Sequence, residues 1–305
     1  MILALNNYDE VYFRFLNIPA GDLRISITNA CNMTCEYCHN EGQSGPGAKY
    51  LSIDKIRYIV QNAKKYGLTK VRITGGDPLV HPNIYDICYM IKNELGISNL
   101  GINTNGFERD ILIQLCQSSL LRQVVIGMDY FDNAVSKKSP IGPSSAEIKE
   151  LVLSLKQMGV NVQIAVVYSD NEEDICKLIA WGLDNHILIK VLEEENYYNL
   201  AFNPKRFESL LQLIKQKFNL SLGLTADLHE AYLYDYRGKI LFFQSHCNRN
   251  ECNLCRNMHL RINAEGKAKI CLFRDDSYDL IAEDFDLNMK KAITYMGTPP
   301  NQEIL

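Results

Sequence analysis

Short runs of apolar residues alternate with amphipathic helical patterns along much of the chain. The strand-like runs cover residues 23–28, 70–74, 99–104, 123–128, 160–167 and 186–192. The helical patterns cover residues 52–66, 82–95, 108–119, 144–158, 171–184 and 204–218. Strands that are apolar on both faces are typical of a parallel sheet covered by helices. The alternation therefore predicts an α/β fold, either a barrel, open or closed, or a doubly wound sheet.

Residues at the predicted helix ends support these boundaries. Ser52 and Asn171 can cap helix N-termini, and Gly67, Gly96 and Gly159 can end helices in a left-handed conformation. In either type of fold, binding and catalytic residues are expected where the parallel strands end.

The pattern changes in the last part of the chain. This part predicts two β-hairpins, with turns at Gly238 and Gly266, and a short helix near residues 285–295. We therefore expect two domains, a βα domain in residues 1–218 and a small hairpin and helix domain in residues 219–305.

The composition is that of an ordinary soluble globular protein, with 47% hydrophobic and 22% charged residues among 305. A net charge of −4 argues against general binding to nucleic acids or membrane surfaces. No apolar stretch is long enough to cross a membrane, and the first residues lack a signal-peptide pattern. We therefore predict a cytoplasmic protein.

Ten cysteines in a cytoplasmic chain are expected to be metal ligands or buried thiols rather than disulfides. Cys88, Cys116 and Cys176 stand alone within helical patterns, and we expect them to be core thiols. Six others fall into two groups of three, which carry the candidate chemistry.

The first group is Cys31, Cys35 and Cys38, spaced C-x3-C-x2-C directly after the first predicted strand. With His39, the last two match a c-type haem attachment pattern, but that reading requires export. A redox pair of Cys35 and Cys38 leaves Cys31 unexplained. A structural zinc with His39 as fourth ligand is chemically possible, although the spacing is not that of the usual zinc motifs. A [4Fe–4S] cluster fits better, because three thiolates from one loop leave one iron open.

Four elements in chain order resemble the motifs of radical S-adenosylmethionine (SAM) enzymes. They are the cysteine motif with an aromatic residue before its last cysteine, TGGDP at 74–78, NTNG at 103–106 and GMD at 127–129. Each stands at the carboxyl end of a predicted strand, which is where a shared site would form.

The resemblance implies a partial (β/α)6 barrel in which a [4Fe–4S] cluster binds SAM through its open iron. Reductive cleavage of SAM would give a 5′-deoxyadenosyl radical that takes hydrogen from the substrate. Cys31, Cys35 and Cys38 would bind the cluster. The residues implied in SAM binding are Tyr37 near the adenine, Gly75, Gly76 and Asp77 near the methionyl part, and Asn103, Asn105 and Asp129 at the ends of the next two strands. An aspartate stands where the family has a glutamate, so this arm is one methylene shorter.

The second group is Cys252, Cys255 and Cys271, two from a tight turn and one from across the second hairpin. Zinc and a second iron–sulfur cluster both suit such a set. Cys247 extends it to C-x4-C-x2-C, a spacing seen in plant-type ferredoxins. Cys247 is either a fourth ligand, which would close the cluster, or a bystander.

Residues from about 20 to 275 also resemble the GTP 3′,8-cyclase family of molybdenum-cofactor biosynthesis. The stretches that carry this resemblance are DLRISITNACN, KVRITGGDP, GVNVQIAVVY, HILIKVLE and LRINAEGKAKICLF. The resemblance implies a second [4Fe–4S] cluster that contacts a guanine, and basic residues that hold a triphosphate. By position, the basic residues are Arg24, Lys70, Arg72, Lys190, His259 and Arg261. Arginine suits phosphate because it can donate two parallel hydrogen bonds.

The chain departs from that family in four ways. His259 and Lys190 stand where the family has arginines, and the hairpin between Cys255 and Cys271 is two residues longer than usual. The family's C-terminal Gly-Gly is replaced by the ending PNQEIL. Fewer guanidinium groups favour a smaller or less charged substrate than GTP.

We therefore expect a radical SAM enzyme with two [4Fe–4S] clusters that acts on a purine nucleotide as a GTP 3′,8-cyclase-like lyase. Its reductant would be a one-electron carrier such as flavodoxin or ferredoxin. A competing hypothesis is a radical SAM enzyme that modifies a peptide or another natural-product precursor. The non-enzyme alternative is a zinc-binding interaction module.

Overall fold

A computed structural model describes the chain in ten segments. They are residues 22–43, 46–132, 142–169, 171–194, 204–222, 230–235, 238–244, 259–269, 277–281 and 284–296. Cys247, Cys252, Cys255 and Cys271 lie outside the described residues, as does the side chain of His259.

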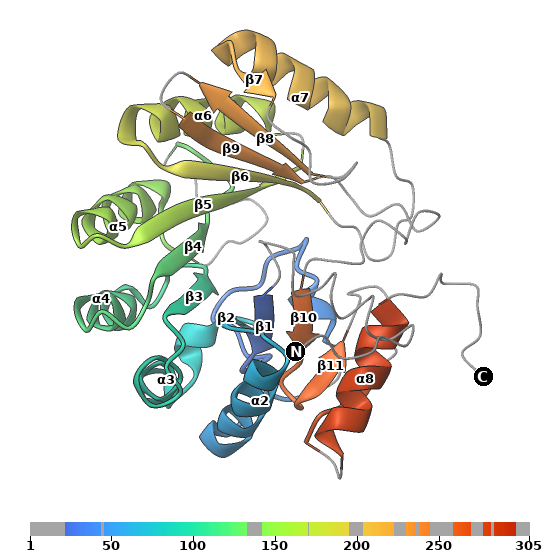
Figure 1. Ribbon diagram of the computed structural model, residues 1–305. Coiled ribbons are helices and arrows are strands. Elements are labelled where there is room, and N and C mark those ends of the chain that lie inside the picture. The colour runs from blue at the N-terminus through green and yellow to red at the C-terminus, as the bar shows by residue number, and fades with distance from the viewer. Residues whose placement is uncertain are drawn as a thin grey trace.

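The described strands form one open, curved sheet in the order β12-β11-β10-β1-β2-β3-β4-β5-β6-β9-β8-β7 (Figure 1). The run from β10 to β9 is parallel throughout, and the pairs at both edges are antiparallel. The parallel strands are β1 (Asp22–Ser26), β2 (Lys70–Thr74), β3 (Asn99–Thr104), β4 (Gln123–Gly127), β5 (Asn161–Tyr168), β6 (Leu188–Glu193), β9 (Gly238–Gln244) and β10 (His259–Ile262). The edge strands are β7 (Ser221–Leu222), β8 (Glu230–Asp235), β11 (Lys267–Lys269) and β12 (Ser277–Asp279).

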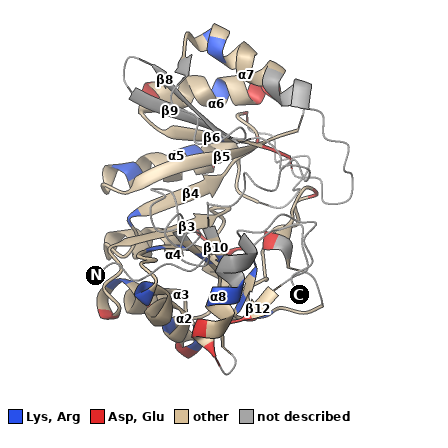
Figure 2. Cartoon of the chain, turned by 45° about the vertical axis from the view of Figure 1, so that its right-hand side comes forward, with Lys and Arg blue, Asp and Glu red and all other residues tan. Residues whose placement is uncertain are grey.

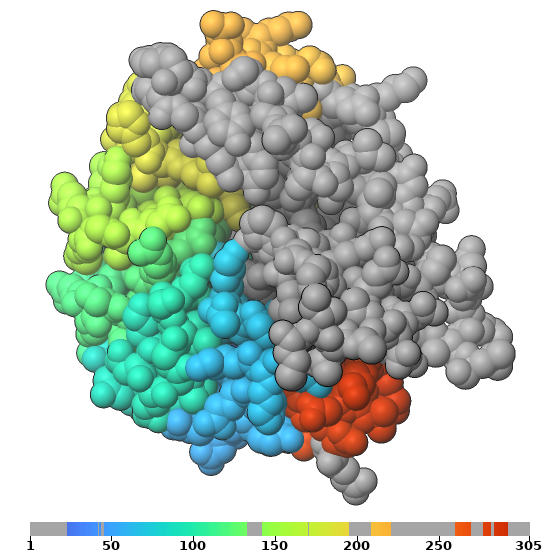
Figure 3. Space-filling view, in the orientation of Figure 1, coloured from blue at the N-terminus to red at the C-terminus, as the bar shows by residue number. Residues whose placement is uncertain are grey.

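Helices cover the outer side of this sheet, and each βα unit lies beside the next in chain order (Figures 1 and 3). The α-helices are α2 (Ile53–Lys65), α3 (Ile84–Tyr89), α4 (Arg109–Gln117), α5 (Ser145–Gln157), α6 (Glu172–Asn185), α7 (Pro204–Phe218) and α8 (Phe285–Met296). Two short 3-10 helices, η1 (Asn40–Gly42) and η2 (Pro78–Val80), follow the first two strands. The sequence therefore predicted the βα order correctly, and the parallel, open arrangement is a partial barrel.

Local details confirm some predicted boundaries and correct others. Ser52 caps α2 by accepting a hydrogen bond from the Lys55 amide, and Gly67, Gly96 and Gly159 have positive φ angles as expected. The helix predicted for residues 82–95 instead begins at Ile84 and continues after Tyr89 as the π-helix η3 (Met90–Glu94). Asn171 precedes α6 but makes no side-chain cap, because its amide bonds to loop backbone atoms instead.

The two faces of the sheet differ in polarity. Ile25, Ile73 and Ile102 point outward and are fully buried in the core beneath the helices. Alternation along the strands directs other side chains inward, including Arg24, Arg72, Asn103, Gln163 and Lys190. The expectation of strands apolar on both faces is therefore wrong for the inner face. Its polar side chains are available to hold a ligand.

The strands after residue 218 join the same sheet. The predicted hairpins are confirmed as β8–β9 and β10–β11, with Gly266 at positive φ in the second turn. β9 pairs with β6, and β10 pairs with β1. The division into domains at residues 218 and 219 stays a prediction, although strands from both sides of it share hydrogen bonds.

Three further findings concern the core and the surface. Cys88, Cys116 and Cys176 are buried, as predicted for core thiols. No described helix combines the length and the apolar character needed to span a membrane. Positive and negative side chains are interspersed on the helices in the view of Figure 2.

Candidate active site

The loop that follows β1 presents Cys31, Cys35 and Cys38 at the carboxyl ends of the parallel strands. Cys31 and Cys38 are exposed, and Cys35 is partly exposed. Backbone amides approach two of the sulfurs: Met33 N lies 3.4 Å from Cys31 Sγ, and Asn40 N lies 3.3 Å from Cys38 Sγ. Amide donors aimed at sulfur stabilise thiolates and are among the contacts that tune iron–sulfur clusters.

The three thiols also influence one another. Burial raises the pKa of Cys31; the Met33 amide opposes this, and the charges of Asp77, Cys38 and Cys35 add to it. Among the described residues, no three histidine, cysteine or acidic side chains converge on the position of a single metal ion. Each cysteine of a cubane cluster binds its own iron, so three thiols on one loop leave the fourth iron open. The exposed thiols with their amide donors fit a [4Fe–4S] cluster.

Gly75 and Gly76, which follow β2, allow close contact with the cysteine loop. The Gly76 amide donates to Thr28 O at 2.9 Å, and the Asp77 amide donates to Ala30 O at 2.8 Å. A Cβ at Gly75 would lie 2.4 Å from Thr28 O, and one at Gly76 would lie 2.2 Å from Ala30 O. Only glycine fits at these two positions without moving the backbone that carries Cys31.

Asp77 is buried and bonds to its own protein. One carboxylate oxygen accepts from Leu79 N at 2.9 Å; the other accepts from Thr104 Oγ1 and Asn105 N, each at 2.7 Å. Burial raises the pKa of this carboxyl, while these hydrogen bonds oppose the shift. The side chain predicted to meet the methionyl part of SAM thus ties the ends of β2 and β3 together.

The two asparagines of the NTNG motif lie differently. Asn105 donates from Nδ2 to Asn32 Oδ1 at 2.8 Å and approaches Cys31 Sγ at 3.7 Å. Asn103 points to the inner face, where its side-chain oxygen is buried without a hydrogen-bond partner among the described residues. Asn105 therefore contacts the cysteine loop, whereas the side-chain oxygen of Asn103 can still accept a hydrogen bond from a ligand.

Tyr37 and Asp129 meet although they are 92 positions apart. The Tyr37 hydroxyl donates a short hydrogen bond to Asp129 Oδ2, and Asp129 Oδ1 accepts from Val167 N at 2.9 Å. Burial, followed by the charge of Asp129, raises the pKa of Tyr37, so the phenol stays protonated. The contact joins the cysteine loop to the ends of β4 and β5.

Arg261, Arg24 and Arg72 form a row on three neighbouring strands. The strand registers pair Arg24 with both other arginines, so all three side chains project from the same face of the sheet. Lys269 on β11 pairs with Arg261 and extends the row. Arg72 donates to Gln123 Oε1 and lies against Gly101 on β3. The structure thus brings together three of the predicted basic residues.

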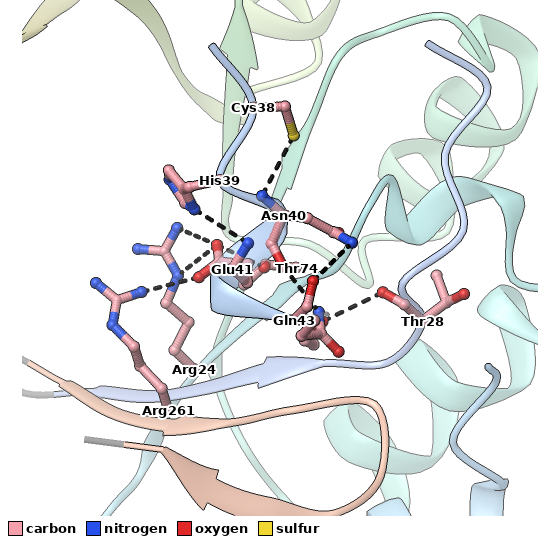
Figure 4. A network of polar contacts seen from close by, with 10 residues as sticks. Arg24, Thr28, Cys38, His39, Asn40, Glu41, Gln43, Thr74 and Arg261 are labelled. Atoms are coloured by element: carbon pink, nitrogen blue, oxygen red, sulfur yellow. Dashed lines mark hydrogen bonds and ion pairs between the residues drawn. The ribbon is translucent and has the colours of Figure 1, made fainter. Parts of the chain in front are cut away.

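Glu41 binds two of these arginines (Figure 4). Its Oε1 accepts from Arg24 Nη2 at 2.8 Å and from Arg24 Nε at 3.1 Å; its Oε2 accepts from Arg261 Nη1 at 2.9 Å. Thr74 Oγ1 donates to Oε1 at 2.8 Å. Burial alone would raise the pKa of this carboxyl, but the charges of Arg24 and Arg261 outweigh it and hold the pKa well below its usual range.

The remaining predicted basic residues lie on the strands that line the interior. Lys70 stands two positions before Arg72 on β2, and so on the same face. Lys190 pairs with Ala165 on β5 and Phe242 on β9. The backbone of His259 pairs with Asp22 at the amino end of β1.

Comparison with known proteins agrees with this geometry. The model of the radical SAM superfamily matches residues 25–182. The chain belongs to the radical SAM superfamily. It is 26% identical over 295 residues to a protein of Pyrococcus horikoshii named probable GTP 3′,8-cyclase, covering 88% of this chain and 91% of that protein. It is 27% identical over 290 residues to GTP 3′,8-cyclase of Actinobacillus pleuropneumoniae, covering 88% and 83%.

The fold also matches solved structures. Streptococcus suis SuiB bound to S-adenosylmethionine aligns with a TM-score of 0.66 and 16% identity, covering 93% of this chain and 66% of that one. Membership of the radical SAM superfamily implies a [4Fe–4S] cluster and SAM as cofactors. The loop of Cys31, Cys35 and Cys38 is the part of the described chain that fits this cluster.

Sequence reasoning missed Glu41 and Lys269. Glu41 stands three residues after Cys38 in an Asn-Glu-Gly turn, and nothing local indicates that it reaches Arg261, 220 positions away. Lys269 is only 7% exposed, although its neighbours in sequence are typical of a hairpin edge. The contact of Glu41 with Arg261 depends on the pairing of β1 with β10, which the sequence pattern did not predict, whereas Lys269 meets Arg261 within the predicted hairpin of β10 and β11.

Proposed function

We propose that this radical SAM enzyme takes hydrogen from a purine nucleoside or nucleotide held on the inner face of the sheet. The observation that carries the proposal is the row of Arg261, Arg24 and Arg72 beneath the cysteine loop, in a chain similar over most of its length to proteins named GTP 3′,8-cyclase. Cations beside a radical source suit a substrate that is anionic or rich in hydrogen-bond acceptors.

The residues of the site would have different roles in SAM cleavage and substrate binding. When bound, the cluster supplies the electron that cleaves the S–C5′ bond of SAM, giving methionine and the 5′-deoxyadenosyl radical. Cys31, Cys35 and Cys38 hold the cluster, and Asn105 steadies the loop beside it. Tyr37, held by Asp129, would lie next to the adenine of SAM. The polar inner face orients the substrate so that one C–H bond meets the radical, which leaves as 5′-deoxyadenosine.

A second [4Fe–4S] cluster remains part of the proposal. Its ligands would be Cys252, Cys255 and Cys271, with Cys247 as a possible fourth. Supporting this, the nearest described residues in sequence are His259, whose backbone pairs at the amino end of β1, and Lys269, whose strand runs back beside β10. Iron content and the absorption spectrum of Cys247→Ala would decide its role, since unchanged values would make it a bystander.

We also expect a soluble one-electron donor, flavodoxin or ferredoxin, to be the partner of this enzyme, and the cytoplasm to be its location. Neither nucleic acid nor membrane is an expected partner, because the net charge of −4 repels both polyanions.

Isotope transfer tests the function directly. The anaerobically reconstituted protein is given SAM, a reductant and guanosine, GMP or GTP deuterated at C3′. Deuterium in 5′-deoxyadenosine from any of the three supports a purine substrate. Cleavage of SAM without deuterium from any of them would overturn hydrogen abstraction at the purine ribose C3′ and favour the peptide hypothesis. Cys35→Ala, which removes a cluster ligand, controls for uncatalysed cleavage.

A further inference from the structure

Two of the arginines of the inner face are already bound to a carboxylate of the chain itself. Arg24 and Arg261 direct three N–H groups at Glu41, and Thr74 adds an O–H. The two arginine side chains are each 21% exposed, and that of Glu41 is 12% exposed. Charge-assisted contacts between partly buried groups are stronger than contacts on the surface.

The backbone at Glu41 is held in a conformation that the chain would not choose by itself. Asn40 has φ 44°, and Glu41 has φ 51° and ψ 29°, in the left-handed region that non-glycine residues rarely adopt. The Glu41 amide donates to His39 Nδ1 at 3.0 Å, and Gln43 Nε2 donates to Ser26 Oγ at 2.6 Å. The loop is thus fixed on both sides of Glu41, so its carboxylate is a built-in part of the site.

Neutral amides supply the remaining hydrogen-bonding capacity nearby. The side-chain oxygens of Asn103 and Gln163 are buried without hydrogen-bond partners among the described residues. Gln163 is only 7% exposed. The side chains of Asn103 and Gln163 both project from the inner face, on the two strands that flank Val125. Buried acceptors require N–H or O–H donors. A nucleobase edge and ribose hydroxyls carry such donors, whereas phosphate at neutral pH carries almost none.

We propose that Glu41 is a specificity-determining residue that fills the anion site of Arg24 and Arg261, so that the enzyme accepts a nucleoside or its monophosphate and rejects polyphosphates. The purine part of this statement rests on the proposed function. The exclusion of polyphosphate rests on Glu41 and does not depend on the purine. A triphosphate would have to displace a carboxylate that the fold holds in place, and the displaced charge would then face it.

Inorganic tripolyphosphate is the probe, because its binding does not require a purine site. Its affinity is measured by anaerobic calorimetry for the reconstituted protein, Glu41→Gln and Glu150→Gln. Glu150 pairs with Arg109 on the exposed side of α5, so its variant makes the same change of net charge away from the site. Removing the Glu41 charge should raise the affinity at least about tenfold, since one unit charge in contact is worth more than this in a partly buried site. Glu150→Gln should match the wild type.

Two results would overturn the proposal. One is that the wild-type protein binds tripolyphosphate as tightly as Glu41→Gln does, or binds GTP at least about tenfold more tightly than GMP. The other is a folded Glu41→Gln variant with no gain in affinity. If that variant does not fold, the wild-type comparison of GTP with GMP still decides. If guanosine, GMP and GTP all fail to bind, a guanine substrate is refuted, and the tripolyphosphate result alone decides the role of Glu41.

Discussion

The hydroxyl of Tyr37 hydrogen-bonds to the carboxylate of Asp129 across the carboxyl ends of β1 and β4. Because Asp129 also accepts the Val167 amide of β5, one tyrosine anchors the cysteine loop to two strands on the far side of the site. The Tyr37 ring is thereby fixed beside the place where the cofactors are expected.

Loss of the Tyr37 hydroxyl should weaken the binding of SAM. Tyr37→Phe keeps the ring but removes a hydrogen bond to a carboxylate, which contributes about 1.5–3 kcal/mol. We expect the dissociation constant for SAM to rise roughly tenfold in anaerobic equilibrium dialysis. Tyr85→Phe is the matched control, since Tyr85 is exposed and its hydroxyl donates to Ser118 Oγ, away from the site. Equal affinities in the two variants would contradict the anchoring role.

Gly76 should be required for cluster assembly. In Gly76→Ala the new Cβ would lie 2.2 Å from Ala30 O, so the backbone next to Cys31 must move. Most of the iron of the first cluster should be lost on reconstitution. Gly127→Ala is the control, because its Cβ would meet no atom within 4 Å in the part of the chain that the structure describes. Full iron content in Gly76→Ala would show that the loop can shift without harm.

Asn105 should raise the reduction potential of the first cluster. Its amide approaches Cys31 Sγ at 3.7 Å, and a donor at a thiolate stabilises the more negative, reduced state. Removal in Asn105→Ala should lower the potential by roughly 40 mV, equivalent to about 1 kcal/mol for one electron. A redox titration followed by electron paramagnetic resonance measures this. Asn62→Ala, which alters an exposed amide on α2, should leave the potential unchanged, and a potential that rises in Asn105→Ala would refute the assignment.

Glu41 should stabilise the fold in a pH-dependent way. Because its pKa in the folded protein is well below its usual value, the stabilisation is present above the unfolded pKa near 4.5 and is lost as the pH falls toward the folded value. At pH 7, Glu41→Gln should lower the free energy of unfolding by about 3 kcal/mol.

Urea unfolding followed by circular dichroism tests this prediction. The difference between wild type and Glu41→Gln should shrink progressively below about pH 4.5. Glu150→Gln should change stability little at any pH, because its ion pair is exposed. A difference that is constant with pH would show that the lost stability is not electrostatic.

Cysteines of the two classes should respond in opposite ways. Cys35→Ala should abolish the first cluster and SAM cleavage while changing the stability of the iron-free chain little. Cys88→Ala should keep the iron but lower the free energy of unfolding by about 1 kcal/mol, because Cys88 lies on the fully buried face of α3. Burial also raises the pKa of Cys116 to about 12, so this thiol should resist alkylation until the protein unfolds. Iron analysis and mass spectrometry after alkylation check both statements, and rapid alkylation of Cys116 in folded protein would contradict its burial.

The order of the βα units and the position of the cysteine loop could both be predicted from the sequence. Apolar strands and amphipathic helices are local patterns, so β2 and β3 were predicted with the bounds that the structure has. The motifs around Cys31, Gly75, Asn105 and Asp129 follow strands that are parallel. Parallel strands end at one edge, and for that reason the sequence alone indicated that these residues share a site.

The partners of the side chains became apparent from the folded arrangement and not from the sequence. It turned Asp77 toward Thr104, joined Tyr37 to Asp129, and placed β10 beside β1 so that Arg261 and Arg24 meet Glu41. Such contacts depend on strand order and register between distant segments, which hydrophobic periodicity does not encode. The sequence therefore indicated the motif residues at the ends of the strands but not Glu41, and strand pairing decided which charges neutralise one another.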